Sequence, residues 1–133
     1  MVAYTKVRPT SNQLRALYGA VGWTAYTSDI PALNQAFAHS VYITAWQDTE
    51  LVGLIRGITD HQTILYIQDL LVLPNFQHQG IATELMQQLM AQYPTGQTVL
   101  LTDDNAKTNG FYHAVGMRPV AQHGLRAFFK DTR

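Results

Sequence analysis

The chain contains no cysteine, so it has no disulfide, no thiol nucleophile and no cysteine-ligated metal. It also lacks an excess of either charge, because nine acidic residues balance nine basic ones. Nucleic-acid binding depends on neutralising many phosphates, so a nucleic-acid partner is not expected. No apolar run reaches the roughly 18 residues of a membrane-spanning helix, and residues 1–6 do not resemble a signal peptide. These absences predict a cytoplasmic protein with no membrane partner.

What the sequence does contain is enough for one folded unit. Its length is 133 residues, of which 47% are hydrophobic, and this suffices for one buried core. No repeat, low-complexity tract or linker interrupts it, so we expect a single domain over 1–133. The five histidines show no metal-ligand spacing, so no metal site is predicted.

Apolar periodicity and turn residues divide the chain into strands and helices. The predicted elements are a strand over 4–7, a helix capped by Ser11 or Asn12 and running to about Val21, a short helix after Pro31, strands over 41–46, 51–58 and 63–73, a helix from Ile81 that ends before Pro94, a strand over 97–102, a helix over 105–115, and strands over 117–121 and 125–129. Short polar links make the central strands antiparallel, and a helical crossover makes the next pair parallel. The order β-αα-βββ-α-β-α-ββ is that of a mixed α/β domain.

Two local features sharpen this pattern. Gly53 and Gly57 lie inside a predicted strand, which indicates a bulge or a close backbone neighbour. Gln77 to Ala82 reads Gln-x-x-Gly-x-Ala between a strand and a helix. Backbone N–H groups at a helix start have no intrahelical partner and favour anions, so a phosphate-bearing ligand is one interpretation. An ordinary strand-to-helix turn is the other.

A second motif follows downstream. Asn105 precedes Tyr112 by seven residues, Tyr112 belongs to a Phe-Tyr pair, and Gly116-Met117 comes next. Together with the Gln77 to Ala82 turn and the order of elements, this pattern resembles the GCN5-related N-acetyltransferase (GNAT) family. Gly116-Met117 stands where that family has Gly-Phe, and Thr108 where alanine is common. The resemblance spans roughly 41–129.

This resemblance implies a GNAT-like fold whose central parallel strands splay apart, with acetyl-coenzyme A as the donor. The pyrophosphate would lie on the turn at the positive end of the following helix. The backbone of the strand before the turn would pair with the pantetheine amides. The cofactor-binding residues that the resemblance implies are Leu71, Val72, Leu73, Gln77, His78, Gln79, Gly80, Ile81, Ala82, Thr83, Asn105 and Tyr112.

Three side chains are candidates for roles near the reaction. Tyr112 is the candidate general acid for the leaving thiolate, with ring packing in the core as the alternative. Asn105 would hydrogen-bond the cofactor arm or a water, and it can also cap a helix. Asp69 lies among apolar strand residues, where desolvation would suit a general base or an amine-binding carboxylate. Its alternatives are capping loop amides, or pairing with Arg56 or Arg118.

The predicted function is therefore N-acetylation of a primary amine, on a small molecule or a protein, by direct attack in a ternary complex. The absence of cysteine fits that direct route. The alternative is a non-catalytic coenzyme A-binding or sensor module of the same fold. Trp23, Tyr26 and Phe37 could line the acceptor site or pack in the core. The expected oligomeric state is a monomer or a homodimer.

Overall fold

The computed structural model describes residues 1–133. The chain forms two compact units, residues 1–101 and residues 102–133, and each is described by itself. The expectation of one acetyltransferase domain over 1–133 therefore stays a prediction. The longest helix has 12 residues, and no helix is long and apolar enough to cross a membrane.

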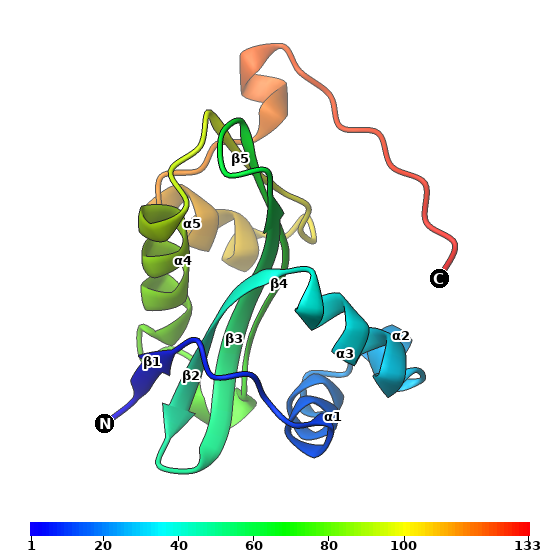
Figure 1. Ribbon diagram of the computed structural model, residues 1–133. Helices are drawn as coiled ribbons and strands as arrows, with labels where there is room; N and C mark the ends of the chain where they lie inside the picture. Colours follow the sequence, from blue (N-terminus) through cyan, green and yellow to red (C-terminus); the bar gives the residue numbers. More distant parts are fainter. The chain divides into compact units, whose positions relative to one another are not determined.

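A five-stranded sheet organises the first unit (Figure 1). Its strands lie in the order in which they occur along the chain: β1 (Ala3–Thr5), β2 (Val41–Gln47), β3 (Glu50–Thr59), β4 (Ile64–Val72) and β5 (Gln97–Leu100). The first four strands pair antiparallel, and β4 pairs parallel with β5. The central hairpins and the parallel crossover are thus confirmed. The mixed five-strand sheet also confirms the predicted fold class.

Three helices join β1 to β2, where the sequence predicted two. They are α1 (Ser11–Ala20), the four-residue α2 (Thr24–Thr27) and α3 (Ile30–Ala38). The cap of α1 is Thr10 and not Ser11 or Asn12, because Thr10 forms a capping box with Gln13. Asp29 caps α3 by accepting the backbone N–H of Ala32.

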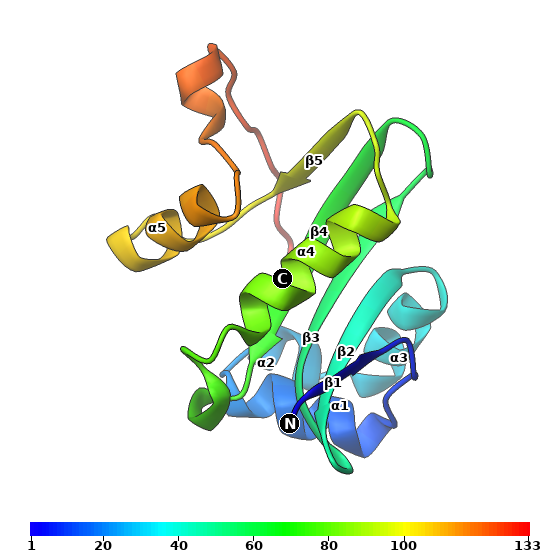
Figure 2. The ribbon, with the colours of Figure 1, turned by 90° about the vertical axis from the view of Figure 1, so that its left-hand side faces the viewer.

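The helices cover both faces of the sheet (Figures 1 and 2). Helices α1 to α3 lie on one face, and α4 (Ile81–Gln92) packs on β2, β3 and β4 from the other. The core under α1 to α3 joins helix and strand side chains: Leu14, Leu17, Tyr18, Ile30, Leu33, Phe37, Leu51, Leu54 and Leu71. Burying a side chain of this size contributes about 1.5–3 kcal/mol, so this layer fixes the strands that carry the site.

The second unit contains α5 (Ala106–Ala114) and a 3-10 turn, η2 (Val120–His123). The predicted strands over 117–121 and 125–129 are wrong, since neither range forms a strand. Pro119 has no N–H to give to a strand ladder, and an isolated two-stranded hairpin is only marginally stable in water. The chain after Gly124 is irregular, and Phe128 and Phe129 are 86% and 74% exposed.

Candidate functional site

A β-bulge shapes the middle of β4. Arg56 lies opposite Asp69 and Gly57 lies opposite Ile67, so Gln68 is an extra residue without a partner on β3. A Cβ on Gly57 would lie 2.8 Å from the Tyr66 carbonyl oxygen. Glycine is therefore required beside the bulge, which confirms the close backbone neighbour expected from the sequence.

The pairing of β4 with β5 ends at the same point. Its last register pair is Ile67 with Leu100, so residues 68–72 continue without a β5 partner (Figure 2). Buried backbone N–H and C=O groups need hydrogen-bond partners. This edge of β4 is therefore suited to pairing with an extended ligand that carries amides.

The three predicted pantetheine-binding residues end this strand. Leu71 and Val72 are buried, with 4% and 7% exposure, and Leu73 is half-buried. The backbone N–H of Leu73 donates to the carbonyl of Val52 on β3, at 2.8 Å. Their side chains thus serve packing, and a ligand role would involve their main chain.

The turn after β4 has an unusual backbone. His78 and Gly80 both have left-handed conformations, with φ values of 62° and 83°. The side chain of Gln77 donates to the Val72 carbonyl at 3.2 Å and so closes the turn onto the strand. Gln79 donates to the carbonyl of Asn75 at 3.3 Å. Alternating backbone conformations of this kind turn main-chain N–H groups toward a common point, where an anion can bind.

Helix α4 starts directly after that turn. Its N-cap residue is Gly80, which has no side chain to satisfy the first N–H groups of the helix. Ile81 is buried, and Ala82 and Thr83 are half-buried. The helix dipole adds a partial positive charge at this end. The start of α4 therefore has free donors for a phosphate, which agrees with the anion-binding interpretation of the Gln77 to Ala82 motif.

Asp69 is buried in an ion pair. Its Oδ2 accepts from Arg56 Nε at 2.7 Å and from the Tyr18 hydroxyl at 2.9 Å, and Asp69 is 1% exposed. Of the alternatives that the sequence left open, pairing with Arg56 is the one observed. A role for Asp69 as a base or as an amine ligand stays a prediction.

Asn105 and Tyr112 belong to the second unit. Asn105 is the N-cap of α5, and its Oδ1 accepts the backbone N–H of Thr108 at 2.9 Å. Its side-chain amide group remains available for a further contact. Tyr112 lies on α5, with its ring 4.9 Å from that of Phe111 in an edge-to-face arrangement.

The environment of Tyr112 affects its acidity. Burial raises the pKa of Tyr112 above its usual value, against a smaller effect of its hydrogen bond with Thr102. A phenol with a raised pKa keeps its proton at neutral pH, as a general acid requires. The electrostatics therefore agree with the role of general acid, which stays a prediction for Tyr112.

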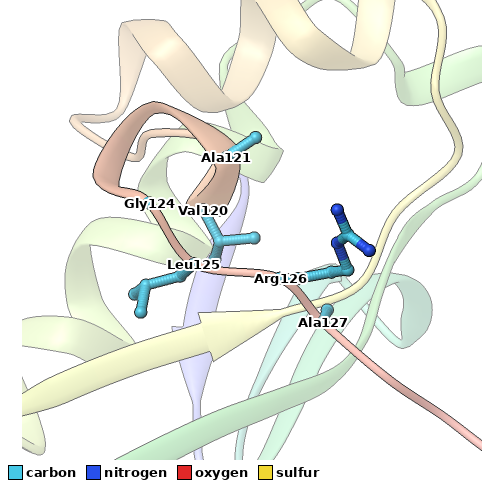
Figure 3. Close-up of a pocket in the computed structure, with 6 residues that line it drawn as sticks. All are labelled: Val120, Ala121, Gly124, Leu125, Arg126 and Ala127. Carbon is cyan, nitrogen blue, oxygen red and sulfur yellow. The ribbon is translucent and has the colours of Figure 1, made fainter.

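A hollow of about 370 Å³ lies in the second unit (Figure 3). Its lining consists of Val120, Ala121, Gly124, Leu125, Arg126 and Ala127. None of these is a predicted site residue, and only Arg126 brings a charged group. We assign no chemistry to this hollow.

Sequence reasoning named Arg56 as a possible partner of Asp69 but missed two other members of its polar cluster, Tyr18 and Ser40. Tyr18 comes from α1 and donates to Asp69 directly, whereas Ser40 follows α3 and is connected to Asp69 through Arg56. In a regular strand Gln68 would point to the face opposite that of Asp69, yet its amide reaches Tyr26 on α2. The two glycines of β3 were the available signal, because they indicated that strand alternation would not hold throughout.

Comparison with known proteins adds an independent finding. The model of the acetyltransferase (GNAT) family matches residues 7–117. A solved GNAT family acetyltransferase of Streptococcus pneumoniae is 30% identical, with a TM-score of 0.85, and the match covers 100% of this chain and 98% of that one. Comparison with curated proteins gives no match.

Two more distant structures share the fold. The acetyltransferase AAC(6')-Iy, solved with the bisubstrate analogue CoA-S-monomethyl-acetylneamine, is 18% identical with a TM-score of 0.71, and the match covers 100% and 99% of the two chains. The PaiA N-acetyltransferase of Thermoplasma acidophilum, solved with coenzyme A, is 15% identical with a TM-score of 0.72, and the match covers 89% of this chain and 90% of that one.

Proposed function

The chain belongs to the GNAT family of acetyltransferases, and we propose that it transfers an acetyl group from acetyl-coenzyme A to a primary amine. The observation that carries this proposal is the edge of β4. Pairing with β5 stops at Ile67, and after a short 3-10 turn (Pro74–Phe76) the unpaired edge is followed by the left-handed turn and the uncapped start of α4. An amide-containing arm that ends in a diphosphate matches both features.

In this proposal each segment has a separate task. The main chain of 77–83 holds the pyrophosphate, and the main chain of 71–73 pairs with the pantetheine amides. The amine nitrogen then attacks the thioester carbonyl carbon, a C–N bond forms, and the C–S bond breaks. A main-chain N–H near Leu71 to Leu73 stabilises the oxyanion. Close approach of the two reactants supplies much of the rate.

Two protons leave the acceptor nitrogen in this reaction, one from the ammonium ion before attack and one after the C–N bond has formed, and the departing thiolate takes up one proton. Tyr112 gives a proton or a hydrogen bond to the departing thiolate, and its raised pKa supports this assignment. The acceptor enters as an ammonium ion, because an alkylamine such as a lysine side chain has an ordinary pKa of about 10.4, and it must lose a proton before attack. Asp69 would need an intermediary for that task, because its carboxylate is buried beside Arg56.

The acceptor of this proposal is an amine of a small molecule or of a protein. A cytoplasmic location and the absence of nucleic-acid and membrane partners remain predictions from composition. At 18% identity, AAC(6')-Iy shows the fold alone, so its bisubstrate analogue indicates no acceptor for this chain.

The proposal is tested by thiol release from acetyl-coenzyme A with a panel of primary amines, beside calorimetry with coenzyme A. We expect micromolar to millimolar binding of coenzyme A and thiol release with at least one amine. Binding without any thiol release would favour the sensor alternative. Absence of binding would contradict both the enzyme and the sensor.

A further inference from the structure

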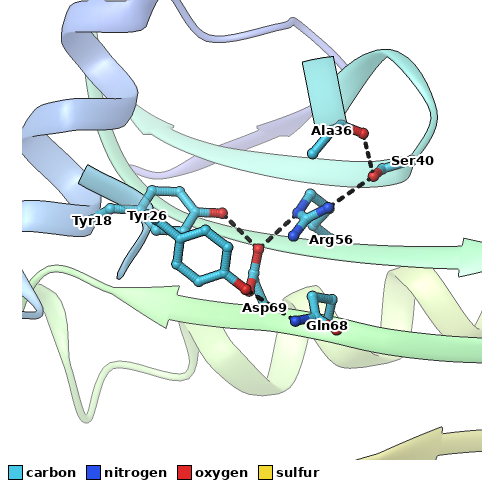
Figure 4. A network of polar contacts seen from close by, with 7 residues as sticks. All are labelled: Tyr18, Tyr26, Ala36, Ser40, Arg56, Gln68 and Asp69. Carbon is cyan, nitrogen blue, oxygen red and sulfur yellow. Dashed lines mark hydrogen bonds and ion pairs between the residues drawn. The ribbon is translucent and has the colours of Figure 1, made fainter. Parts of the chain in front are cut away.

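The bulge turns two consecutive side chains toward the same helical layer. Consecutive residues of a regular strand point to opposite faces. Here the amide of Gln68 donates to the Tyr26 hydroxyl at 3.0 Å, while Asp69 accepts from the Tyr18 hydroxyl at 2.9 Å. The rings of Tyr18 and Tyr26 lie 5.1 Å apart. Gln68 and Asp69 therefore belong to one polar cluster (Figure 4).

The groups around Asp69 Oδ2 already have hydrogen-bond partners. Oδ2 of Asp69 accepts from Tyr18 and Arg56, and Arg56 Nη1 donates to Ser40 Oγ at 3.1 Å. The Ser40 hydroxyl in turn donates to the Ala36 carbonyl at 2.6 Å. Oδ1 of Asp69 is buried and meets no donor at hydrogen-bonding geometry. Burying a carboxylate oxygen without a hydrogen-bond donor costs free energy, so a hydroxyl group nearby is favoured to direct its proton to Oδ1.

The hydroxyl of Tyr26 is the group that can supply this proton. Tyr26 is half-buried, and burial and the Asp69 carboxylate raise its pKa, against the opposing hydrogen bond from Gln68. The phenol therefore stays protonated at neutral pH. A phenol has a single proton to donate, and a carboxylate is a stronger acceptor than an amide. With its proton directed to Asp69, the Tyr26 oxygen is left as an acceptor.

These hydrogen-bond assignments determine the orientation of the Gln68 amide. Only the NH₂ group of a glutamine can donate to the Tyr26 oxygen, so Nε2 faces Tyr26. Oε1 then points away from Tyr26, and Gln68 is an exposed residue. The carbonyl oxygen of Gln68 is thus presented as a hydrogen-bond acceptor in a set direction.

The position of Gln68 along β4 also suits it to binding the acceptor amine. Under the proposed function, the cofactor arm runs from the turn back along β4, past Leu73 and Leu71. Gln68 lies five residues before Leu73, which is about 16 Å at the usual strand rise. It also marks the point where β4 and β5 part. Gln68 therefore lies toward the end of the arm that carries the thioester.

We propose that Gln68 binds the acceptor amine, with its Oε1 accepting an N–H of the attacking nitrogen, and that Tyr26 and Asp69 are positioning residues that hold its amide in that orientation. This inference rests on the proposed function. The hydrogen bond uses an N–H of the neutral amine and leaves the nitrogen lone pair free for the carbonyl carbon. It also disfavours tertiary amines, which have no N–H to donate.

Steady-state kinetics tests the proposal with the acceptor that the amine panel identifies. Gln68→Ala is expected to raise KM for the acceptor about tenfold, with KM for acetyl-coenzyme A unchanged within about twofold. Tyr26→Phe raises the same KM by a smaller factor. The double variant matches Gln68→Ala alone, because Tyr26 acts through Gln68. Gln47→Ala, at an exposed glutamine that ends β2, is the matched control.

Two kinetic results would overturn the assignment. One is an acceptor KM of Gln68→Ala equal to that of the wild type, and the other is a double variant whose effects simply multiply. Either result leaves the proposed function intact, since turnover itself would persist.

A second measurement does not need turnover. In ¹H–¹⁵N spectra with coenzyme A present, n-butylamine is titrated against the side-chain amide signals. The Gln68 signal should move in the wild type and should move less in Tyr26→Phe, while the Gln47 signal stays in place. A Gln68 signal that does not respond at any concentration would overturn the inference even if no amine is turned over.

Discussion

Arg56 Nε lies 2.7 Å from Asp69 Oδ2, and the two residues face each other as a register pair of β3 and β4. Both are almost fully buried, with exposures of 5% and 1%. Desolvating two charges is costly, so such a pair persists when further hydrogen bonds satisfy it. Tyr18 supplies one of them, and the pair thereby ties α1 to the strand just beyond the bulge.

Removing one charge of this ion pair should destabilise the protein more than removing both charges. Asp69→Asn leaves the Arg56 charge buried without its partner, and we expect a loss of about 3 kcal/mol in the free energy of unfolding. The double replacement Arg56→Met with Asp69→Leu should cost less, because neither charge remains. Urea unfolding of the two variants and the wild type measures this. Equal losses in both variants would contradict this expectation.

The protein should lose stability in alkali through Tyr18. Burial, and then the charge of Asp69, raise the pKa of Tyr18 far above its usual value, so the folded state keeps this proton. The unfolded chain releases it near pH 10. The stabilisation is therefore complete below about pH 10 and declines as pH rises, by about 1.4 kcal/mol per pH unit for one such group.

Unfolding free energies at pH 9 and pH 11 check this expectation. Tyr18→Phe should show a smaller difference between the two pH values than the wild type, although it is less stable at both. Parallel declines in the two proteins would assign the alkaline loss to other groups.

Two glycines offer a matched comparison of backbone strain. Gly80 has a φ of 83°, and a side chain there costs about 1–2 kcal/mol in the left-handed region. Gly80→Ala should therefore destabilise the fold and weaken coenzyme A binding by moving the turn. Gly19 lies in α1 with open space at its Cβ position, so Gly19→Ala should stabilise by about 0.5–1 kcal/mol and leave binding unchanged.

Thermal unfolding and calorimetry with coenzyme A measure the two glycine variants. If Gly80→Ala binds coenzyme A as tightly as the wild type, anion binding does not depend on the conformation of the turn.

Loss of the Tyr112 hydroxyl should affect the chemical step. Tyr112→Phe is expected to lower kcat at least tenfold, within the range typical of general acid catalysis, with coenzyme A affinity retained. Tyr93→Phe, whose ring lies 5.7 Å from that of His61, is the control and should keep its turnover. Single-turnover rates and calorimetry check both. Normal turnover of Tyr112→Phe would remove Tyr112 from the mechanism.

Local patterns predicted most of the first unit. Strands over 41–46, 51–58 and 63–73 became β2, β3 and β4 with boundaries shifted by at most one residue. The helix beginning at Ile81 ends at Gln92, before Pro94. These elements combine strong hydrophobic periodicity with clear turn residues, and their short links leave few alternative pairings.

The errors arose where a distant contact decides the structure. The expected strands of the second unit had apolar residues, yet strand pairing depends on a neighbour that sequence does not specify. Likewise, the burial of Asp69 was expected, but its contact with Tyr18 spans 51 residues of chain. The direction of the Gln68 side chain depends on the β-bulge, because Gln68 is itself the unpaired residue that interrupts the alternation of side chains along β4.

That unpaired residue makes β4 sensitive to length more than to composition. If Gln68 were deleted, every side chain on one side of the cut would exchange faces. Asp69 would then part from Arg56 and Tyr18, or the segment that aligns with β5 would turn its buried residues outward. A substitution in β4 changes the contacts of one side chain. Deletion of one residue would instead turn all side chains on one side of the deletion to the opposite face of the sheet.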